Sequence, residues 1–439
     1  MKKIISILLS MGLVVTSFAG CGTKSTAKED GNGQGEPVEI VLYQYKLEIA
    51  KQLDAAVEKY MSQHKDVKII VESNGEGYGT TLQAKMQSGQ EPTIFNVQGP
   101  SDVNDWMHKL EDLSDQPWIE HTAKGTLEDI TKDDKVYGLP CGVEGYGFIY
   151  NKGIFEDAGI HAEEIKDFDS LEKAVIELDA KIKSGELKEK YPDLEAVFEY
   201  PAKETWLTGQ HTTNVALSVE LGSSLNAYEA KSIEYKYADQ LKKIVDLQSS
   251  YTAAGENRGK LNSVDNTACV ENGLAIERVA MAQQGNWIYP SVSAIDQEVA
   301  DELSILPMPL QGVVEDSIPV GVPMYWVVNK DATDAEKAAA KDFLNWLYQS
   351  EEGKEIIVNE FNFIPAFTNY DGLQAKDELS RSIQSYVNEE KTIPWVFNGY
   401  PSGWCMDVMG SQIQKYLSGN ATWEEVIEVV RDKWEELSK

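Results

Sequence analysis

The alternation of apolar and polar positions predicts that folded structure begins at Val38 with a parallel α/β sheet. Apolar side chains alternate over 38–43, as in a strand, and then recur at helical spacing over 49–60. This order predicts a parallel sheet if it repeats, and ligands of such sheets bind beyond the carboxyl ends of the strands. It does repeat, with a strand over 67–71, a helix over 80–88 and a strand over 92–97.

Strand and helix patterns continue to the end of the chain. Thr333 and Glu336 have the spacing of a capping box, which predicts the start of a helix. Strands are expected over 303–306 and within 321–330. Further helices are expected where apolar residues recur every three or four positions, over 168–183, 214–221, 237–247, 266–282 and 423–437.

A glycine-rich stretch over 136–152 is interpreted as a crossing between two packed bodies. Four glycines within ten residues allow close backbone approach, and a short apolar strand resumes at Phe148. Glu144 is the only charged residue between Lys135 and Lys152. Two interpretations stay open for Glu144: a carboxylate that meets a polar group between the two bodies, or a solvent-facing side chain in a glycine-rich turn.

The length of the chain and its net charge indicate how many lobes to expect and which partners to exclude. A chain of 439 residues is too long for one core, so two lobes or two domains are expected. The 40 Lys and Arg residues against 72 Asp and Glu residues give a net charge of -32. This charge repels phosphate backbones and anionic lipid, so we expect no nucleic-acid partner.

The N-terminus has the features of an export signal. A basic start precedes an apolar run over 4–15, which is too short to span a bilayer and suits a signal peptide. The following residues, 18–21, resemble a bacterial lipobox, in which Cys21 is lipidated and becomes the mature N-terminus; a plain Ala-Gly cleavage site is the alternative. Residues 22–36 are polar and glycine-rich, which predicts a disordered tether.

The other cysteines do not form a disulfide framework. Cys141, Cys269 and Cys405 are an odd number and lie far apart in the sequence, without C-x-x-C spacing. We interpret them as small buried apolar residues, although one disulfide among the three stays possible.

Motifs of common enzyme classes are absent from the sequence. There is no G-x-S-x-G, no P-loop and no G-x-G-x-x-G motif, so neither a cofactor nor catalysis is expected. Two alternatives stay open: a secreted glycoside hydrolase, for which the many carboxylates could supply a pair, and a surface adhesin lipoprotein. The dispersed histidines predict no metal site and are interpreted as surface residues: His64, His108, His121, His161 and His211.

Several stretches, taken in order, resemble the family-1 extracellular solute-binding proteins, the lipoprotein receptors of carbohydrate ABC importers that are related to maltodextrin-binding proteins. The likeness extends over nearly all of 38–439, and no single motif carries it. The stretches are the lipobox, 86–95, 136–140 with 148–152, 281–287, 320–323 with 326–330, and 343–348 with 352–353.

The resemblance implies an α/β fold of the periplasmic-binding-protein type, with two discontinuous lobes that close on a ligand about a hinge. The implied partners are an oligosaccharide and the permease subunits of the importer. The protein is expected to be a monomer, exported and held at the outer face of the bacterial cytoplasmic membrane by its N-terminal lipid only. The implied division is 1–21 signal peptide and lipobox, 22–36 tether, 37–143 and 326–372 N-terminal lobe, and 144–325 and 373–439 C-terminal lobe.

The resemblance also assigns ligand-binding residues in the N-terminal lobe and the hinge. Sugar sites combine stacking aromatic rings with polar side chains. Glu144 matches the hinge carboxylate of maltodextrin-type receptors. The polar and aromatic residues after the predicted strands are further candidates, with capping and solvation as the alternative: Tyr45, Lys46, Glu48, Tyr78, Asn96 and Gln98.

In the C-terminal lobe, aromatic residues are the candidates. Trp287 follows Gly285-Asn286, where the family places a tryptophan that stacks on a sugar ring. A polar loop contributes Tyr200 or Trp206. Four aromatics over 395–404 cannot share one helical face, so at least one is expected at the ligand, and Trp395 or Trp404 is the choice. For each residue, burial in the core is the alternative.

Overall fold

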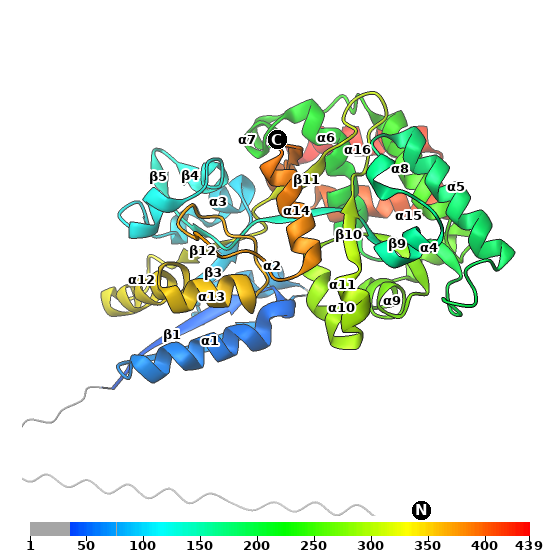
Figure 1. The fold of residues 1–439 in the computed structure, drawn as a ribbon. Helices are drawn as coiled ribbons and strands as arrows, with labels where there is room; N and C mark the ends of the chain where they lie inside the picture. The colour runs from blue at the N-terminus through cyan, green and yellow to red at the C-terminus, as the bar shows by residue number, and fades with distance from the viewer. Residues whose placement is uncertain (1–35, 76) are drawn as a thin grey trace, which may run out of the picture. The chain divides into compact units, whose positions relative to one another are not determined.

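Two β-sheets, each with its own helices, form two lobes (Figure 1). The computed structural model describes residues 36–75 and 77–439, of which 37–439 form one unit. The predicted signal peptide, Cys21 and almost all of the predicted tether lie outside the described residues. No helix in the described residues is both long enough and apolar enough to cross a membrane.

The first sheet has the strand order β2-β1-β3-β12-β6. Its first three strands are parallel, and β12 runs antiparallel to both of its neighbours. The strand-helix-strand-helix-strand order predicted from the N-terminal pattern is confirmed. The elements are β1 (Val38–Gln44), α1 (Ala50–Gln63), β2 (Val67–Ser73), α2 (Tyr78–Ser88), β3 (Ile94–Val97), β6 (Leu139–Pro140) and β12 (Tyr325–Val328).

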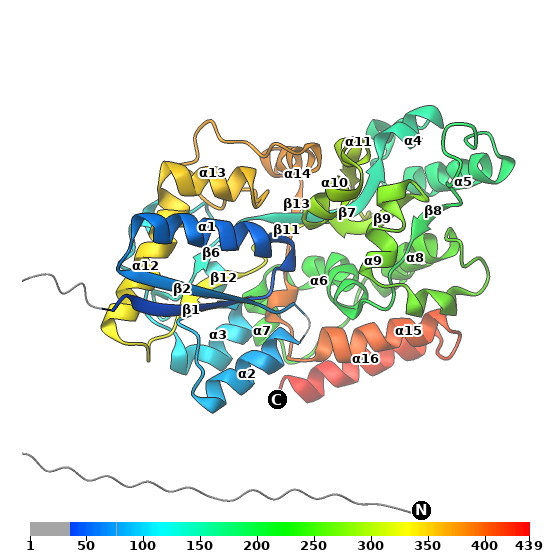
Figure 2. The ribbon, with the colours of Figure 1, turned by 90° about the horizontal axis from the view of Figure 1, so that it is seen from below.

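Helices cover both faces of this sheet because each face carries apolar side chains. One face packs against α1, α12 (Asp334–Gln349) and α13 (Glu351–Asn359). The other packs against α2, α3 (Pro100–Trp106) and the loop around Ile130. Figure 2 shows α1 lying along β1 and β2. A two-stranded ribbon, β4 (Thr131–Lys132) and β5 (Lys135–Val136), lies beyond this core.

The second sheet is built around β7 (Glu144–Asn151), all of whose residues are buried. Its strand order is β13-β11-β7-β9-β8, and β10 pairs with the second half of β7. The other strands are β8 (Ala196–Glu199), β9 (Val279–Gly285), β10 (Leu303–Leu306), β11 (Ile318–Gly321) and β13 (Thr392–Pro394).

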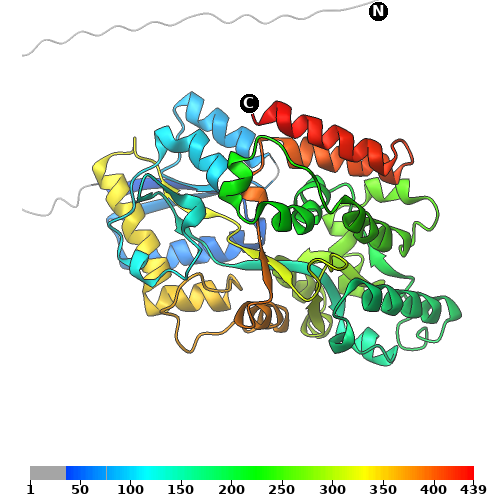
Figure 3. The same cartoon turned by 90° about the horizontal axis from the view of Figure 1, so that it is seen from above.

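Helices also cover the second sheet. Figure 3 shows α5 (green) and α16 (red) at opposite sides of this lobe. Helices on one core are α4 (Lys152–Asp157), α5 (Phe168–Ser184), α6 (Thr212–Leu221), α7 (Ser224–Glu229), α8 (Ala238–Ser250), α15 (Ser411–Leu417) and α16 (Trp423–Leu437). Helices on the other are α9 (Asn266–Val270), α10 (Tyr289–Ile295), α11 (Gln297–Asp301) and α14 (Glu378–Asn388).

The prediction of a helix over 266–282 is wrong. The chain forms the short helix α9 and a single 3-10 turn, Leu274–Ile276, and then enters the strand β9. Glu277, at φ 56°, lies just before β9 and breaks the helical path. Because β9 is a central strand, buried on both faces between β7 and β8, it lacks the alternation by which a half-buried strand is identified.

The chain crosses between the two sheets at the glycine-rich stretch and again between β11 and β12. At the first crossing β6 belongs to the first sheet and β7 to the second. Close packing explains the glycines: a Cβ on Gly142 would lie 3.0 Å from Cβ of Phe363, and one on Gly147 would lie 2.4 Å from the carbonyl oxygen of Leu306. A larger side chain at either position would force the backbone apart.

Candidate functional site

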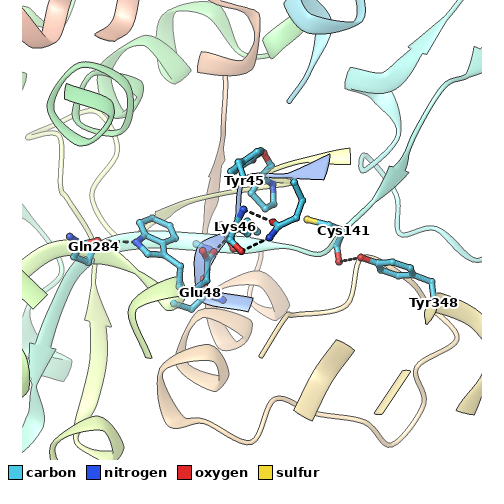
Figure 4. A network of polar contacts seen from close by, with 12 residues as sticks. Tyr45, Lys46, Glu48, Cys141, Gln284 and Tyr348 are labelled. Carbon is cyan, nitrogen blue, oxygen red and sulfur yellow. Dashed lines mark hydrogen bonds and ion pairs between the residues drawn. The ribbon is translucent and has the colours of Figure 1, made fainter. Parts of the chain in front are cut away.

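A buried ion pair joins the end of β1 to the start of β7. Lys46 Nζ lies 2.6 Å from Glu144 Oε1 and 2.9 Å from Glu48 Oε1. Figure 4 shows Lys46 and Glu48 with Tyr45 beside them and the dashed contacts among these residues. The Lys46 ammonium also lies 5.6 Å from the centre of the Phe363 ring. The sequence candidates Lys46, Glu48 and Glu144 therefore form one cluster between the two lobes.

Burial and the neighbouring charges shift the pKa values of Lys46 and Glu144 in opposite directions. Burial alone lowers the pKa of Lys46, but the carboxylates of Glu144 and Glu48 outweigh it and raise that pKa well above its usual value. Burial raises the pKa of Glu144, and the Lys46 ammonium offsets part of this rise. Lys46 is therefore charged at all physiological pH values, and its charge is engaged by two carboxylates.

The other candidates of the first lobe lie at the ends of β1 and β3. The Tyr45 hydroxyl donates to the Pro323 carbonyl oxygen over 2.7 Å. The Tyr78 ring lies edge-on to Tyr45, with centroids 5.4 Å apart, and its hydroxyl accepts from the Asn96 backbone N–H over 2.7 Å. Asn96 is 2% exposed, and neither its Nδ2 nor its Oδ1 has a hydrogen-bond partner among the described residues. The half-buried Gln98 follows, and its N–H donates to Asp102.

Six rings of the second lobe form a cluster, which we call the aromatic cluster. Each pair of neighbouring rings has centroids between 4.3 and 6.4 Å apart. The rings come from four separate parts of the chain, and β7, β9 and β13 hold three of these parts in register. The members are Tyr146, Trp206, His211, Trp287, Trp395 and Phe397.

His211 lies at the centre of the aromatic cluster, so its interpretation as a surface residue is wrong. It is 7% exposed, stacks on Tyr146 at 4.3 Å and contacts four further rings. Burial and, to a lesser extent, the charge of Lys46 lower its pKa to about 3, so the imidazole is neutral at physiological pH. A π-helical turn, Trp206–His211, presents the ring, and such turns are frequent at functional sites.

Trp287 is held in place by its neighbours along β9. Its indole Nε1 donates to Gln284 Oε1 over 2.9 Å, and Gln284 donates in turn to Asn266. The ring lies against Gly285, where a Cβ would approach it to 2.3 Å. Trp287 and Glu144 line the same small cavity of about 10 Å³, which brings the aromatic cluster next to the ion pair.

Trp395 and Trp404, between which the sequence could not choose, lie in different surroundings. Trp395 belongs to the aromatic cluster and packs on Gly321, and its Nε1 has no partner. The side-chain amide of Asn214 holds the loop that carries Trp395. Its Nδ2 donates to the Pro394 carbonyl oxygen, and its Oδ1 accepts from the Val396 N–H. Trp404 is fully buried, 4.9 Å from the Trp434 ring, with its Nε1 bonded to the Val430 carbonyl oxygen.

Tyr200 and Trp206 also differ. Tyr200 is fully buried in the core of the second lobe. Trp206 is half-buried in the aromatic cluster, and its Nε1 donates to Glu204 over 2.9 Å. The structure thus brings Trp206, Trp287 and Trp395 together and leaves Tyr200 and Trp404 apart from them.

The two lobes also touch beside the aromatic cluster. The Ser224 hydroxyl at the start of α7 donates to Asp129 of the first lobe, and the Asn398 amide lies 3.5 Å from the same carboxylate. Ser101 in α3 donates to the Tyr400 carbonyl oxygen over 3.1 Å. Residues of both lobes therefore meet across the space between the sheets.

Three cysteines lie within the described residues. Cys141 and Cys269 are buried and Cys405 is half-buried, and all three are free thiols. Within residues 36–75 and 77–439, no group of three or more His, Cys, Asp or Glu residues is placed to hold a metal ion.

Comparison with known proteins identifies the family. A model of the bacterial extracellular solute-binding protein family matches residues 55–383, three quarters of the chain. The chain belongs to the bacterial extracellular solute-binding proteins. The resemblance drawn from the sequence motifs is thereby confirmed. A similar protein of this kind is the melibiose/raffinose/stachyose-binding protein MelE of Bacillus subtilis, which is 21% identical over 92% of this chain and 90% of its own length.

Solved structures with the same fold include two further sugar-binding proteins. A sugar transporter protein from Bacillus licheniformis in complex with stachyose covers 91% of this chain and 100% of its own, with 18% identity and a TM-score of 0.68. RafE in complex with raffinose covers 92% of this chain and 100% of its own, with 15% identity and a TM-score of 0.71. The expected two-lobed fold of the periplasmic-binding-protein type is confirmed by these likenesses.

Proposed function

We propose that this solute-binding protein is the receptor of an ABC importer and captures an oligosaccharide between its two lobes. The observation that carries the proposal is the aromatic cluster, which lies beside the buried Lys46–Glu144 pair. Sugars present apolar C–H faces that stack on rings, and hydroxyl groups that bond to carboxylates and amides. Several ring faces in one cluster suit an oligosaccharide better than a single sugar, because each sugar ring needs its own face.

The relatives support this choice of ligand. MelE is named for melibiose, raffinose and stachyose, and the Bacillus licheniformis protein was solved with stachyose. The ligand-binding residues that we propose for this chain are sequence candidates from both lobes, to which we add His211 and Phe397. They are Tyr45, Lys46, Glu48, Tyr78, Asn96, Gln98, Glu144, Trp206, His211, Trp287, Trp395 and Phe397.

Ligand binding would act by shifting an equilibrium between open and closed lobes. A ligand that contacts both lobes favours the closed form, and a change from 1% to 99% closed requires about 5.5 kcal/mol of differential binding free energy. The proposed lobes are 37–143 with 326–372, and 144–325 with 373–439. The sheet membership of β6, β7, β11 and β12 supports this division.

The place of the protein in the cell is part of the same proposal. A lipid on Cys21 would hold the protein at the outer face of the cytoplasmic membrane, and residues 22–36 would link this anchor to the lobes. A flexible chain of some fifteen residues would reach roughly 20 Å, and a tether of that length would keep the lobes close to a permease in that membrane. Loss of membrane association in a Cys21→Ala variant, with the soluble form secreted, is the expected result.

Calorimetric titration and thermal-shift measurements against a panel of α- and β-linked oligosaccharides test the function. A micromolar ligand that changes tryptophan fluorescence and is recovered unchanged on chromatography would support the proposal. Shortened products would instead indicate a glycoside hydrolase. No binding by any sugar would point to a ligand of another class.

A further inference from the structure

We infer that the site selects uncharged sugars and discriminates against acidic ones, such as uronic acids. This inference rests on the proposed function and adds the chemical class of the ligand. It is carried by two independent observations. The charged groups of the site leave a net negative charge, and its unpartnered buried groups are neutral and include acceptors that only a hydrogen-bond donor can satisfy.

The charge balance of the site is negative. Of the side chains assigned to the site, Lys46 is the only cation, while Glu48 and Glu144 are both within 2.9 Å of its Nζ. His211, the one other basic group, is neutral because burial lowers its pKa to about 3. An acidic ligand therefore meets one ammonium group that two carboxylates already engage.

Further carboxylates around the site make its surroundings more negative. Glu204 accepts the indole N–H of Trp206, and Asp102 accepts the backbone N–H of Gln98. The nearby Lys203 points to solvent, where it pairs with Asp265. Asp129, on the contact between the lobes, is another carboxylate. The three carboxylates Glu204, Asp102 and Asp129 repel an anion, and the Lys203 ammonium is already paired with Asp265.

The unpartnered polar groups match hydroxyl groups. The amide of Asn96 is 2% exposed and lacks a partner at both Nδ2 and Oδ1, so it needs one acceptor and one donor whichever way it is turned. The Trp395 indole N–H, 5% exposed, needs an acceptor. A sugar hydroxyl both donates and accepts, whereas a carboxylate only accepts. A neutral sugar can satisfy these groups, and a carboxylate at the same place would leave the Asn96 oxygen without a donor.

Oxidised sugars provide a direct test. Each neutral oligosaccharide that binds in the panel is compared with two of its derivatives. In one derivative a primary alcohol is replaced by a carboxylate, and in the other the same alcohol is replaced by the isosteric carboxamide. Purified protein is titrated with all three by calorimetry at low salt. We expect the carboxylate to bind at least about tenfold more weakly than the carboxamide, because the two differ in charge but hardly in shape.

A pair of variants identifies the groups responsible. Glu48→Gln removes one negative charge from the site, and we expect it to reduce the carboxamide-to-carboxylate ratio by roughly threefold. Glu39→Gln makes the same change on the exposed part of β1, where Glu39 pairs with Lys68, and should leave the ratio unchanged. The ratio of the unmodified protein tests the inference even if Glu48→Gln folds poorly.

The outcomes separate this inference from the proposed function. Acidic derivatives that bind as tightly as their carboxamides, or acidic sugars that are the only ligands found, would overturn the inference while the receptor for sugars stands. Absence of binding by every sugar, neutral or acidic, would overturn both.

Discussion

Lys46 Nζ lies 2.6 Å from Glu144 Oε1, and each side chain is only 5% exposed. The contact joins the turn that follows β1, in the first lobe, to the first residue of β7, in the second. Charges this deeply buried are stable only as partners, because an unpaired charge has lost its hydration. Stability and the alignment of the two lobes therefore depend on the same pair.

Replacement of Lys46 by Met should lower the free energy of unfolding by about 3 kcal/mol, because it leaves two carboxylates without their cation. Equilibrium unfolding in urea measures this loss. Lys68→Met is the matched control: its pair with Glu39 is more than half exposed, so we expect a change below about 0.5 kcal/mol. The double variant Lys46→Met/Glu144→Gln should recover part of the loss, and a single variant as stable as the original protein would contradict the prediction.

Replacement of Trp287 by Ala should weaken sugar binding severalfold or more without unfolding the protein. The ring is half-buried next to Glu144 and supplies a stacking face, worth about 0.5–1.5 kcal/mol beyond its buried area. Calorimetry with the sugar found in the panel gives the affinity, and circular dichroism reports the fold. Trp346→Ala, on α12 of the first lobe, serves as control. Unchanged affinity in a folded Trp287→Ala protein would remove this residue from the site.

His211 should make the protein less stable in acid. The unfolded chain binds a proton at this residue near pH 6.5, but the folded protein does so only near pH 3. Between these values the unfolded state holds the extra proton, so His211 contributes a loss of stability as the pH falls below 6.5, at most about 1.4 kcal/mol per pH unit. This part of the slope should vanish in His211→Gln.

Urea unfolding of His211→Gln and the original protein at pH 7.5 and pH 5.0 measures this contribution. Because carboxylates also titrate in this range, the quantity to compare is the difference between the two proteins at each pH. His161→Gln, at an exposed side chain, controls for the loss of a histidine. A difference that does not change with pH would show that the His211 ring is accessible to protons in the folded state.

Replacement of Gly147 by Ala should cost about 3 kcal/mol of stability. The new Cβ would lie 2.4 Å from the Leu306 carbonyl oxygen, where backbone must move to admit it. Gly79→Ala in α2 is the matched control, since no atom of the described residues lies within 4 Å of the added Cβ, and it should be neutral or stabilise the protein by up to about 1 kcal/mol. Similar melting temperatures for the two variants would disprove the close approach of β7 and β10.

The sequence sufficed for elements whose signals are local. Alternation identified β1, a capping box with helical spacing identified α12, and helical spacing alone identified α16, because these patterns are complete within the element. Strand β9 was missed because it pairs with strands from distant parts of the chain and because its apolar residues are buried in two different hydrophobic cores. Its Ala, Met and Gln residues favour a helix, and tertiary contacts override this preference.

The same limit applies to the site. The sequence predicts Trp287 and Glu144 as candidates because each stands in a motif of the family. It does not predict His211, since the burial of this residue depends on Tyr146, Trp395 and Phe397, which lie 65 or more positions away. The choice between Trp395 and Trp404 likewise depends on the path of the loop after β13, which turns Trp395 towards Tyr146 of β7 and Trp404 towards Trp434. The spacing of the aromatic residues in the sequence does not predict this path.

The strand order also determines when each sheet can be completed as the chain is synthesised. β12, at 325–328, separates β3 from β6 in the first sheet, and β11, at 318–321, pairs with β7 in the second. A chain that emerges from the ribosome with its N-terminus first can therefore complete neither sheet until most of its length has been made. Both sheets therefore stay incomplete during most of synthesis. A chain without completed sheets can still be threaded through a secretion pore.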